Sequence, residues 1–169
     1  MVGLGFTEII TYSFTSPDSA DKLGAEEGSP LRSFVKILNP LTVDQSVMRT
    51  SLVPGLLTTV KTNILHDEKD LKLFEWGKVF IRKEGSDLPL EKNYLAALMT
   101  GLYCQKTWNS DERHVDFYDI KGALEALLKD IGLHGSVLQK ETGIPRYDPG
   151  VCASIFCSGS LIGHVGRVS

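Results

Sequence analysis

Apolar residues recur at helical spacing in two long stretches of this chain. In the first, residues 51–66, Leu52, Leu56, Val60 and Ile64 follow one another at four-residue intervals and form one apolar stripe. Pro54 would break a helix interior, so it must lie in the first turn, where Ser51 or Thr50 is the expected cap. The pattern predicts a helix that begins close to Pro54 and ends at the polar residues from His66 onward.

The second stretch predicts a helix over residues 117–131, with Gly132 as its natural end. Asp116 and Asp119 precede or open this helix, where carboxylates cap free N–H groups and favour the positive end of the helix dipole. We prefer this role to acid–base chemistry by the pair. A short third helix is expected between Ser16-Pro17-Asp18 and Gly24.

Segments rich in β-branched and aromatic residues predict strands between these helices. The last two form a hairpin through Gly159-Ser160. The expected strands are residues 6–14, 34–38, 71–81, 94–103, 151–158 and 161–168. Long helices interleaved with hairpin-linked strands indicate an α+β fold, an antiparallel sheet flanked by helices, in a single domain over residues 1–169.

The net charge and the lengths of the apolar runs argue against two kinds of partner, nucleic acid and membrane. A net charge of −3 argues against a free-standing nucleic-acid binder, which carries a basic excess. No apolar run is long enough to span a membrane, and no secretory signal opens the chain. Both ends of the sequence fall inside predicted elements, so we expect a piece of a longer chain, cut at its C-terminal side.

The cysteines and histidines do not have the spacing of a disulfide framework or a metal site. Three cysteines are too few for a disulfide framework, and Cys152 and Cys157 fall on opposite faces of one predicted strand. The expected setting is therefore a reducing cytoplasm. The histidines have no metal-ligand spacing; they are His66, His114, His134 and His164.

A series of short blocks occurs in a fixed order along the chain. Its centre consists of Asn39-Pro40-Leu41, Met48-Arg49-Thr50-Ser51-Leu52 through Leu57, and Leu73-Phe74-Glu75 with Gly77 and Val79-Phe80. The other blocks are Gly5 to Phe14 before this centre, and Asp116 to Gly122 and Asp148-Pro149-Gly150 with Ile162-Gly163 after it. Together the blocks resemble the class II synthetase-like core of the phenylalanine–tRNA ligase beta chain.

The resemblance implies a non-catalytic module that supports assembly with the catalytic alpha chain, in a heterotetramer of two alpha and two beta chains. It implies ATP-dependent attachment of phenylalanine to tRNA(Phe), with ATP and Mg²⁺ at the alpha chain and no cofactor or metal held by these residues. The full assembly, in the cytoplasm, would bind the tRNA.

Two alternatives remain open. Class II synthetases hold the ATP α-phosphate with an arginine at a strand end, followed two residues later by glutamate, and Arg82 and Glu84 have that spacing. The resemblance puts Ile81 where the arginine is expected, and a one-residue offset turns a strand side chain to the other face. The other alternative is a stand-alone paralogue that binds a small amino acid.

Arg49 is the most informative charged residue. Its position just before an apolar helix requires a partner, because an unpaired buried charge is costly. We expect an intramolecular clamp to Glu75 or another acid, in a block that borders the subunit interface. Trp76 and Trp108 are either interface anchors or core residues. The candidate interface and structural residues are Asn39, Pro40, Met48, Arg49, Leu52, Pro54, Leu56, Phe74, Glu75, Gly77 and Phe80.

Overall fold

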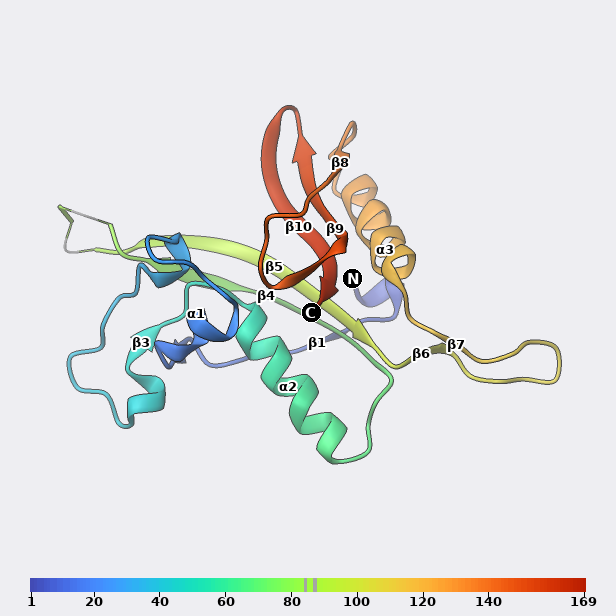
Figure 1. Cartoon of the computed structure of the whole chain (residues 1–169), viewed down its shortest axis with the longest axis horizontal. Coiled ribbons are helices and arrows are strands. Elements are labelled where there is room, and N and C mark those ends of the chain that lie inside the picture. Colours follow the sequence, from blue (N-terminus) through green and yellow to red (C-terminus); the bar gives the residue numbers. More distant parts are fainter. Residues whose placement is uncertain (84, 87) are drawn as a thin grey trace. The chain divides into compact units, whose positions relative to one another are not determined.

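The structure is a computed structural model that describes residues 1–83, 85–86 and 88–169, and its chain divides into two compact units. The N-terminal unit comprises Phe6–Leu98 with Val2, and the C-terminal unit comprises Met99–Ser169 with Met1 and Gly3–Gly5. The elements of both are drawn in Figure 1. The expectation of a single domain over residues 1–169 stays a prediction.

The N-terminal unit is built on a sheet with the strand order β1-β4-β5. Its strands are β1 (Thr7–Glu8), β4 (Leu71–Ile81) and β5 (Leu90–Thr100), and β1 lies parallel to β4. The helix α2 (Val53–Leu65) packs against this sheet through Leu56, Val60 and Leu73. The predicted strand at residues 71–81 is confirmed with its bounds unchanged, and Pro54 lies in the first turn of α2 as expected.

Two predicted strands of this unit differ from the structure. Residues 6–14 form only β1 and the first residue of β2 (Phe14–Thr15). Between the two strands, the N–H and hydroxyl groups of Thr11 donate to the buried Glu75 side chain of β4 instead of to a partner strand. The strand predicted at residues 34–38 is wrong. Its only ladder contact among the described residues is an isolated bridge from Lys36 to Val47 in β3 (Val47–Met48), a strand too short to pair with more.

Short helices fill the remainder of the N-terminal unit. Ser16 accepts a hydrogen bond from the Asp18 N–H at 3.2 Å where α1 (Asp18–Lys22) begins, and Gly24 follows the helix with φ +64°. The 3₁₀ turns are η2 (Pro30–Arg32) and η3 (Val43–Gln45), and η1 (Val2–Leu4) lies at the start of the chain.

The C-terminal unit packs α3 (Phe117–Asp130) against a sheet with the order β10-β9-β8. Leu128 from the helix meets Ala153, Ile155 and Val165 from the sheet in one apolar cluster. The strands are β8 (Val137–Lys140), β9 (Tyr147–Cys157) and β10 (Ser160–Val168), all antiparallel to their neighbours. A further antiparallel pair is β6 (Leu102–Cys104) with β7 (Arg113–His114).

The hairpin and the second helix follow the sequence closely. Ser158 and Gly159 form the tight turn, both with positive φ, which is one residue earlier than the sequence indicated. Asp116 caps α3, its side chain accepting from the Tyr118 and Asp119 N–H groups. Strand β8 was missed, because its four residues, two apolar and two polar, are mostly exposed and show no apolar alternation.

The α+β class is confirmed, but one continuous antiparallel sheet is not what forms. Across the described residues the strands fall into small separate sheets, and the β1–β4 pair is parallel. Among those same residues, no helix has the length and apolar character needed to cross a membrane.

Candidate functional site: a buried clamp at Arg49

Arg49 lies between β3 and α2, where three separate parts of the N-terminal unit meet. Its backbone N–H donates to the Ser13 carbonyl at 2.9 Å, and its own carbonyl accepts from the Phe80 N–H at 2.9 Å. Backbone bonds on both sides therefore fix the direction of the Arg49 side chain before any charge interaction is considered. Only 7% of Arg49 is exposed.

The guanidinium forms a buried ion pair with Glu75 of β4. Arg49 Nη1 lies 2.7 Å from Glu75 Oε1, and Arg49 Nε donates to the Lys78 carbonyl at 2.9 Å. Glu75 is only 1% exposed. The predicted clamp between Arg49 and Glu75 is thus confirmed as an intramolecular contact.

Thr11 completes the ion pair and was missed from the sequence. Its hydroxyl accepts from Arg49 Nη1 at 2.9 Å and donates to Glu75 Oε2 at 2.7 Å, while its N–H donates to Glu75 Oε1 at 3.2 Å. A hydroxyl can both donate and accept, which suits a position between a cation and an anion. A lone threonine in an apolar run carries no signal for this role in one sequence.

Gly77 leaves the space that the guanidinium needs. A Cβ at this position would lie 2.5 Å from Arg49 Nη2 and 3.3 Å from a methyl group of Leu52. Thr11, Arg49, Leu52, Glu75 and Gly77 therefore form one packed group, which we call the clamp. Its charges are paired and hydrogen-bonded, the condition under which buried ions are tolerated. The clamp ties the segment before β2, the start of α2 and strand β4 together.

The other predicted site residues lie around the clamp rather than in it. Leu56 and Phe74 are buried in the core, and Met48, Pro54 and Phe80 are half-buried. The Ser51 hydroxyl accepts from the Val53 N–H at 3.2 Å where α2 begins. Asn39 and Pro40 are exposed in the loop between η2 and η3. The clamp and its neighbours are thus mostly inaccessible to a partner, apart from this loop.

Several large apolar side chains are exposed on the segments that lead to Thr11 and to β3. Leu38 and Leu41 are 97% and 94% exposed, and Ile10, on the segment that leads to Thr11, is 92% exposed. Val43 and Tyr12 are also exposed. We call these five residues with Asn39 and Pro40 the apolar rim. The β2–β3 pairing and the hydrogen bond from Arg49 to Thr11 join the two segments that carry it.

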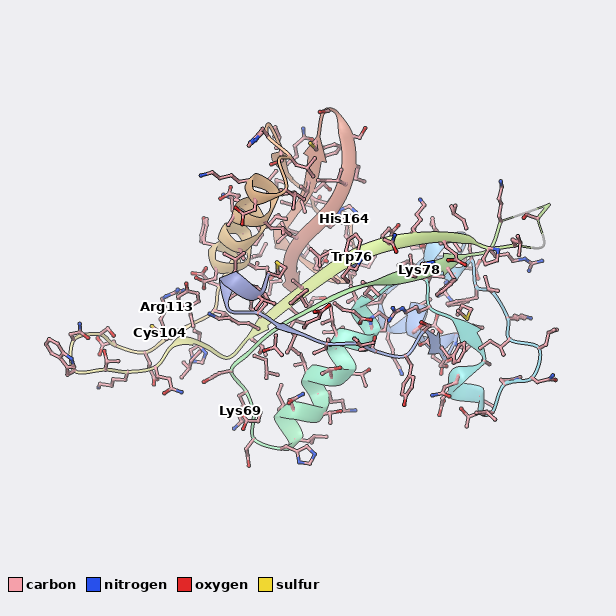
Figure 2. The ribbon with its side chains drawn as sticks, turned by 180° about the vertical axis from the view of Figure 1, so that it is seen from behind. Lys69, Trp76, Lys78, Cys104, Arg113 and His164 are labelled. Atoms are coloured by element: carbon pink, nitrogen blue, oxygen red, sulfur yellow. The ribbon has the colours of Figure 1, made fainter. Side chains whose placement is uncertain are left out.

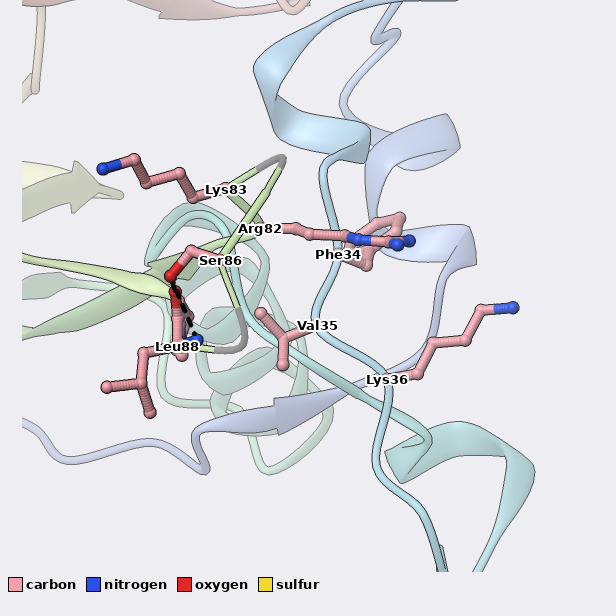
Figure 3. Close-up of a pocket in the computed structure, with 8 residues that line it drawn as sticks. Phe34, Val35, Lys36, Arg82, Lys83, Ser86 and Leu88 are labelled. Atoms are coloured by element: carbon pink, nitrogen blue, oxygen red, sulfur yellow. Dashed lines mark hydrogen bonds between the residues drawn. The ribbon is translucent and has the colours of Figure 1, made fainter.

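Arg82 lies outside this group, in a shallow pocket of about 370 Å³. Figure 3 shows Arg82 and Phe34 along its wall, with Lys36 and Lys83 extending in opposite directions. The Arg82 N–H donates to the Ser33 carbonyl at 2.8 Å, just beyond the end of β4 at Ile81. Glu84, the second half of the proposed ATP pair, lies outside the described residues. The described residues that line the pocket include no carboxylate to hold Mg²⁺.

A second polar cluster lies in the C-terminal unit, where Ser154 of β9 pairs with His164 of β10. His164 is labelled in Figure 2. The Ser154 hydroxyl is 3.2 Å from His164 Nδ1 and donates to Glu141 at 3.1 Å. Burial lowers the pKa of His164, and nearby Arg146 lowers it further. Hydrogen bonds from the Gly143 and Thr142 N–H groups lower the pKa of Glu141. The serine stands between the acid and the histidine, which is not the order of a nucleophilic triad.

The cysteines and histidines are otherwise dispersed. Cys104, Cys152 and Cys157 are free thiols, and burial raises the pKa of Cys152. Within the described part of the chain, no three metal-ligating side chains gather into a group.

Comparison with known proteins identifies relatives over the whole chain. The family model described as the phenylalanyl tRNA synthetase beta chain CLM domain matches residues 1–169. The chain is 42% identical over 168 residues to the phenylalanine–tRNA ligase beta subunit of Geobacter metallireducens, and 43% identical over 167 residues to that of Syntrophus aciditrophicus. Each match covers 99% of this chain and 21% of the relative, so the chain spans about a fifth of their length.

Solved structures show a related fold at lower identity. A pyrrolysyl-tRNA synthetase from Desulfitobacterium hafniense superposes with a TM-score of 0.64 at 17% identity, over 96% of this chain and 51% of that one. This likeness concerns the fold alone.

Proposed function

Because this chain belongs to the family of the phenylalanyl-tRNA synthetase beta chain CLM domain, we propose that it is a non-catalytic module that helps to hold the ligase's alpha subunit in the assembled enzyme. The reaction served is the ATP-dependent attachment of phenylalanine to tRNA(Phe). ATP and Mg²⁺ act at the alpha subunit in this proposal. It places the complete enzyme in the cytoplasm, as two alpha and two beta subunits, with the tRNA bound by the whole assembly.

The observation that carries the proposal is the pairing of a buried clamp with an apolar rim. Arg49, the arginine of the most distinctive block, is buried and uses Nε and Nη1 to bind the Lys78 carbonyl, Thr11 and Glu75, so these two donors are not available to a substrate phosphate. The rim exposes aliphatic side chains that water solvates poorly. Stable subunit interfaces are apolar at their centre and depleted in charge, which matches the rim.

The class II likeness does not by itself support catalysis. Ile81, half-buried, ends β4 where the resemblance expects an ATP-binding arginine, and Arg82 follows it beyond the strand, exposed. A hydrocarbon side chain cannot bind a phosphate.

The test is assembly of the complete beta chain with the alpha subunit. We expect Leu41→Gln to raise the alpha–beta dissociation constant by about tenfold, because it removes apolar contact area from the rim. Leu65→Gln, at the exposed end of α2, is the matched control and should leave assembly unchanged. Equal affinity for wild type and Leu41→Gln would refute a role of the rim in assembly.

A further inference from the structure

The strands β6 and β7 continue into an extended hairpin loop over residues 105–112, which we call the arm (Figure 1). At its tip Trp108 is 95% exposed. The neighbouring Thr107 N–H donates to the Ser110 carbonyl at 2.9 Å, and the Thr107 hydroxyl contacts Asn109 and Ser110. These bonds close a tight turn that holds the indole in water.

The base of the arm is firmly tied to α3. The Arg113 guanidinium donates to both carboxylate oxygens of Asp119, at 2.7 and 2.8 Å, and lies over the Tyr103 ring at 4.3 Å. Hydrogen bonding to Asp119 raises the pKa of Arg113. Figure 2 shows Arg113 and Cys104 together at this base. Because Asp119 also belongs to the capping box of α3, the helix fixes the base from which the arm extends.

An exposed tryptophan on a positioned turn has the character of an interface anchor. Tryptophan is enriched among residues that dominate binding energy, since its large ring fills a pocket at little cost in side-chain entropy. A fixed turn lowers the ordering cost of binding further. The sequence left open whether Trp108 is an interface anchor or a core residue. Its exposure excludes the core position.

The charges of the arm select the kind of partner. The loop carries one lysine, Lys106, against two carboxylates, Asp111 and Glu112, while the arginine at its base is neutralised by Asp119. A nucleic-acid contact needs a cationic surface around a stacking ring, which this arm lacks. A protein pocket with an apolar floor and a basic rim fits both the indole and the two acids.

We propose that Trp108 inserts into such an apolar, basic-rimmed pocket of the alpha subunit, as a second contact in addition to the one made by the apolar rim. This inference rests on the proposed assembly function, because the relatives of this chain are beta subunits of the ligase. The arm and the rim lie in different units of the chain, so a substitution in one leaves the residues of the other unchanged.

The experiment compares complete beta chains that carry Trp108→Ala or Tyr118→Ala. Tyr118 is a second exposed aromatic residue of the same unit, 75% exposed on α3, and serves as the matched control. We expect Trp108→Ala to raise the alpha–beta dissociation constant by about tenfold to hundredfold, with the melting temperature of the free beta chain unchanged. Tyr118→Ala should keep the wild-type affinity. An unchanged affinity for Trp108→Ala overturns the inference.

A photoreactive benzophenone amino acid at position 108 identifies the partner directly. Cross-links to the alpha subunit support the proposal, whereas cross-links to tRNA or to the beta chain outside residues 1–169 overturn it. The Leu41→Gln variant separates the two proposals: if it weakens assembly and Trp108→Ala does not, the arm fails and the rim stands. If neither variant weakens assembly, both fail.

Discussion

The absence of a side chain at position 77 decides whether Arg49 can reach Glu75. The guanidinium fills the space beside Gly77, and hydrogen bonds to the Lys78 carbonyl and Thr11 prevent it from moving away. The charges were visible in the sequence, and so was the need to pair them. The identity of the third partner, Thr11, was not, because it lies 38 residues from Arg49 along the chain.

We therefore expect Gly77→Ala to lower the free energy of unfolding by about 1–3 kcal/mol, since the new methyl group overlaps Arg49 Nη2. Chemical denaturation of the beta chain measures this change. The control is Gly122→Ala in α3, where nothing lies within 4 Å of the added methyl group. That variant should be neutral or gain about 0.5–1 kcal/mol from helix propensity. Similar values for both variants would show that space beside Gly77 is not limiting.

His164 makes the stability of the C-terminal unit depend on pH. Its pKa is lowered in the folded state, so below about pH 6.5 the unfolded chain binds a proton first, and the free energy of unfolding falls as pH falls. His164→Gln should flatten this slope below about pH 6.5, measured by denaturation at each pH. His134→Gln, exposed in the same unit, should retain it. Glu141, with its pKa also lowered, acts in a separate window below pH 4.5. A slope that survives His164→Gln would assign the effect to another group.

Among the elements, those with strong local signals matched the structure and those held by distant partners did not. The strand at residues 71–81 and both long helices carry their own periodicity and end signals. The strand expected at residues 34–38 has an apolar run but almost no partner strand, so its backbone stays irregular. Strand β8 is the opposite case: it has no apolar alternation of its own, but it forms a strand because it pairs with β9.

The start of α3 allows a local test at this scale. Asp116→Ala removes the acceptor for two backbone N–H groups and should cost about 0.5–2 kcal/mol of stability. Asp130→Ala, at the opposite end of the same helix, should be neutral or slightly stabilising, since a carboxylate there opposes the helix dipole. Thermal unfolding of the two variants gives the comparison, and equal melting temperatures would contradict the capping role.

At the scale of the whole molecule, the two proposals differ in whether this module binds ATP during aminoacylation or only supports subunit assembly. The family and the fold class follow from the sequence and the comparisons, but a class II-like fold can serve either catalysis or assembly. The distinction rests on single residues such as Ile81 and Arg82, whose positions at the end of β4 the structure supplies.

We expect the complete alpha–beta enzyme with Arg82→Ala to aminoacylate tRNA within about twofold of the wild-type rate. If Arg82 instead bound the ATP phosphate, its removal should lower kcat by about 10²–10³-fold, as for other preorganised transition-state contacts. Steady-state aminoacylation and ATP–pyrophosphate exchange, run on the same preparations, distinguish the two outcomes. A large loss in both would restore the catalytic alternative.

The sequence by itself determined the long helices, the strand at residues 71–81, the hairpin turn and the need for a partner to Arg49. Each depends on side-chain periodicity, turn residues or charge within a short span. Only the tertiary structure decided that β1 runs parallel to β4, that Thr11 joins the clamp, and that Trp108 stands in solvent. These features depend on which distant segments meet, and the free energy of such contacts is a property of the packed chain rather than of any local pattern.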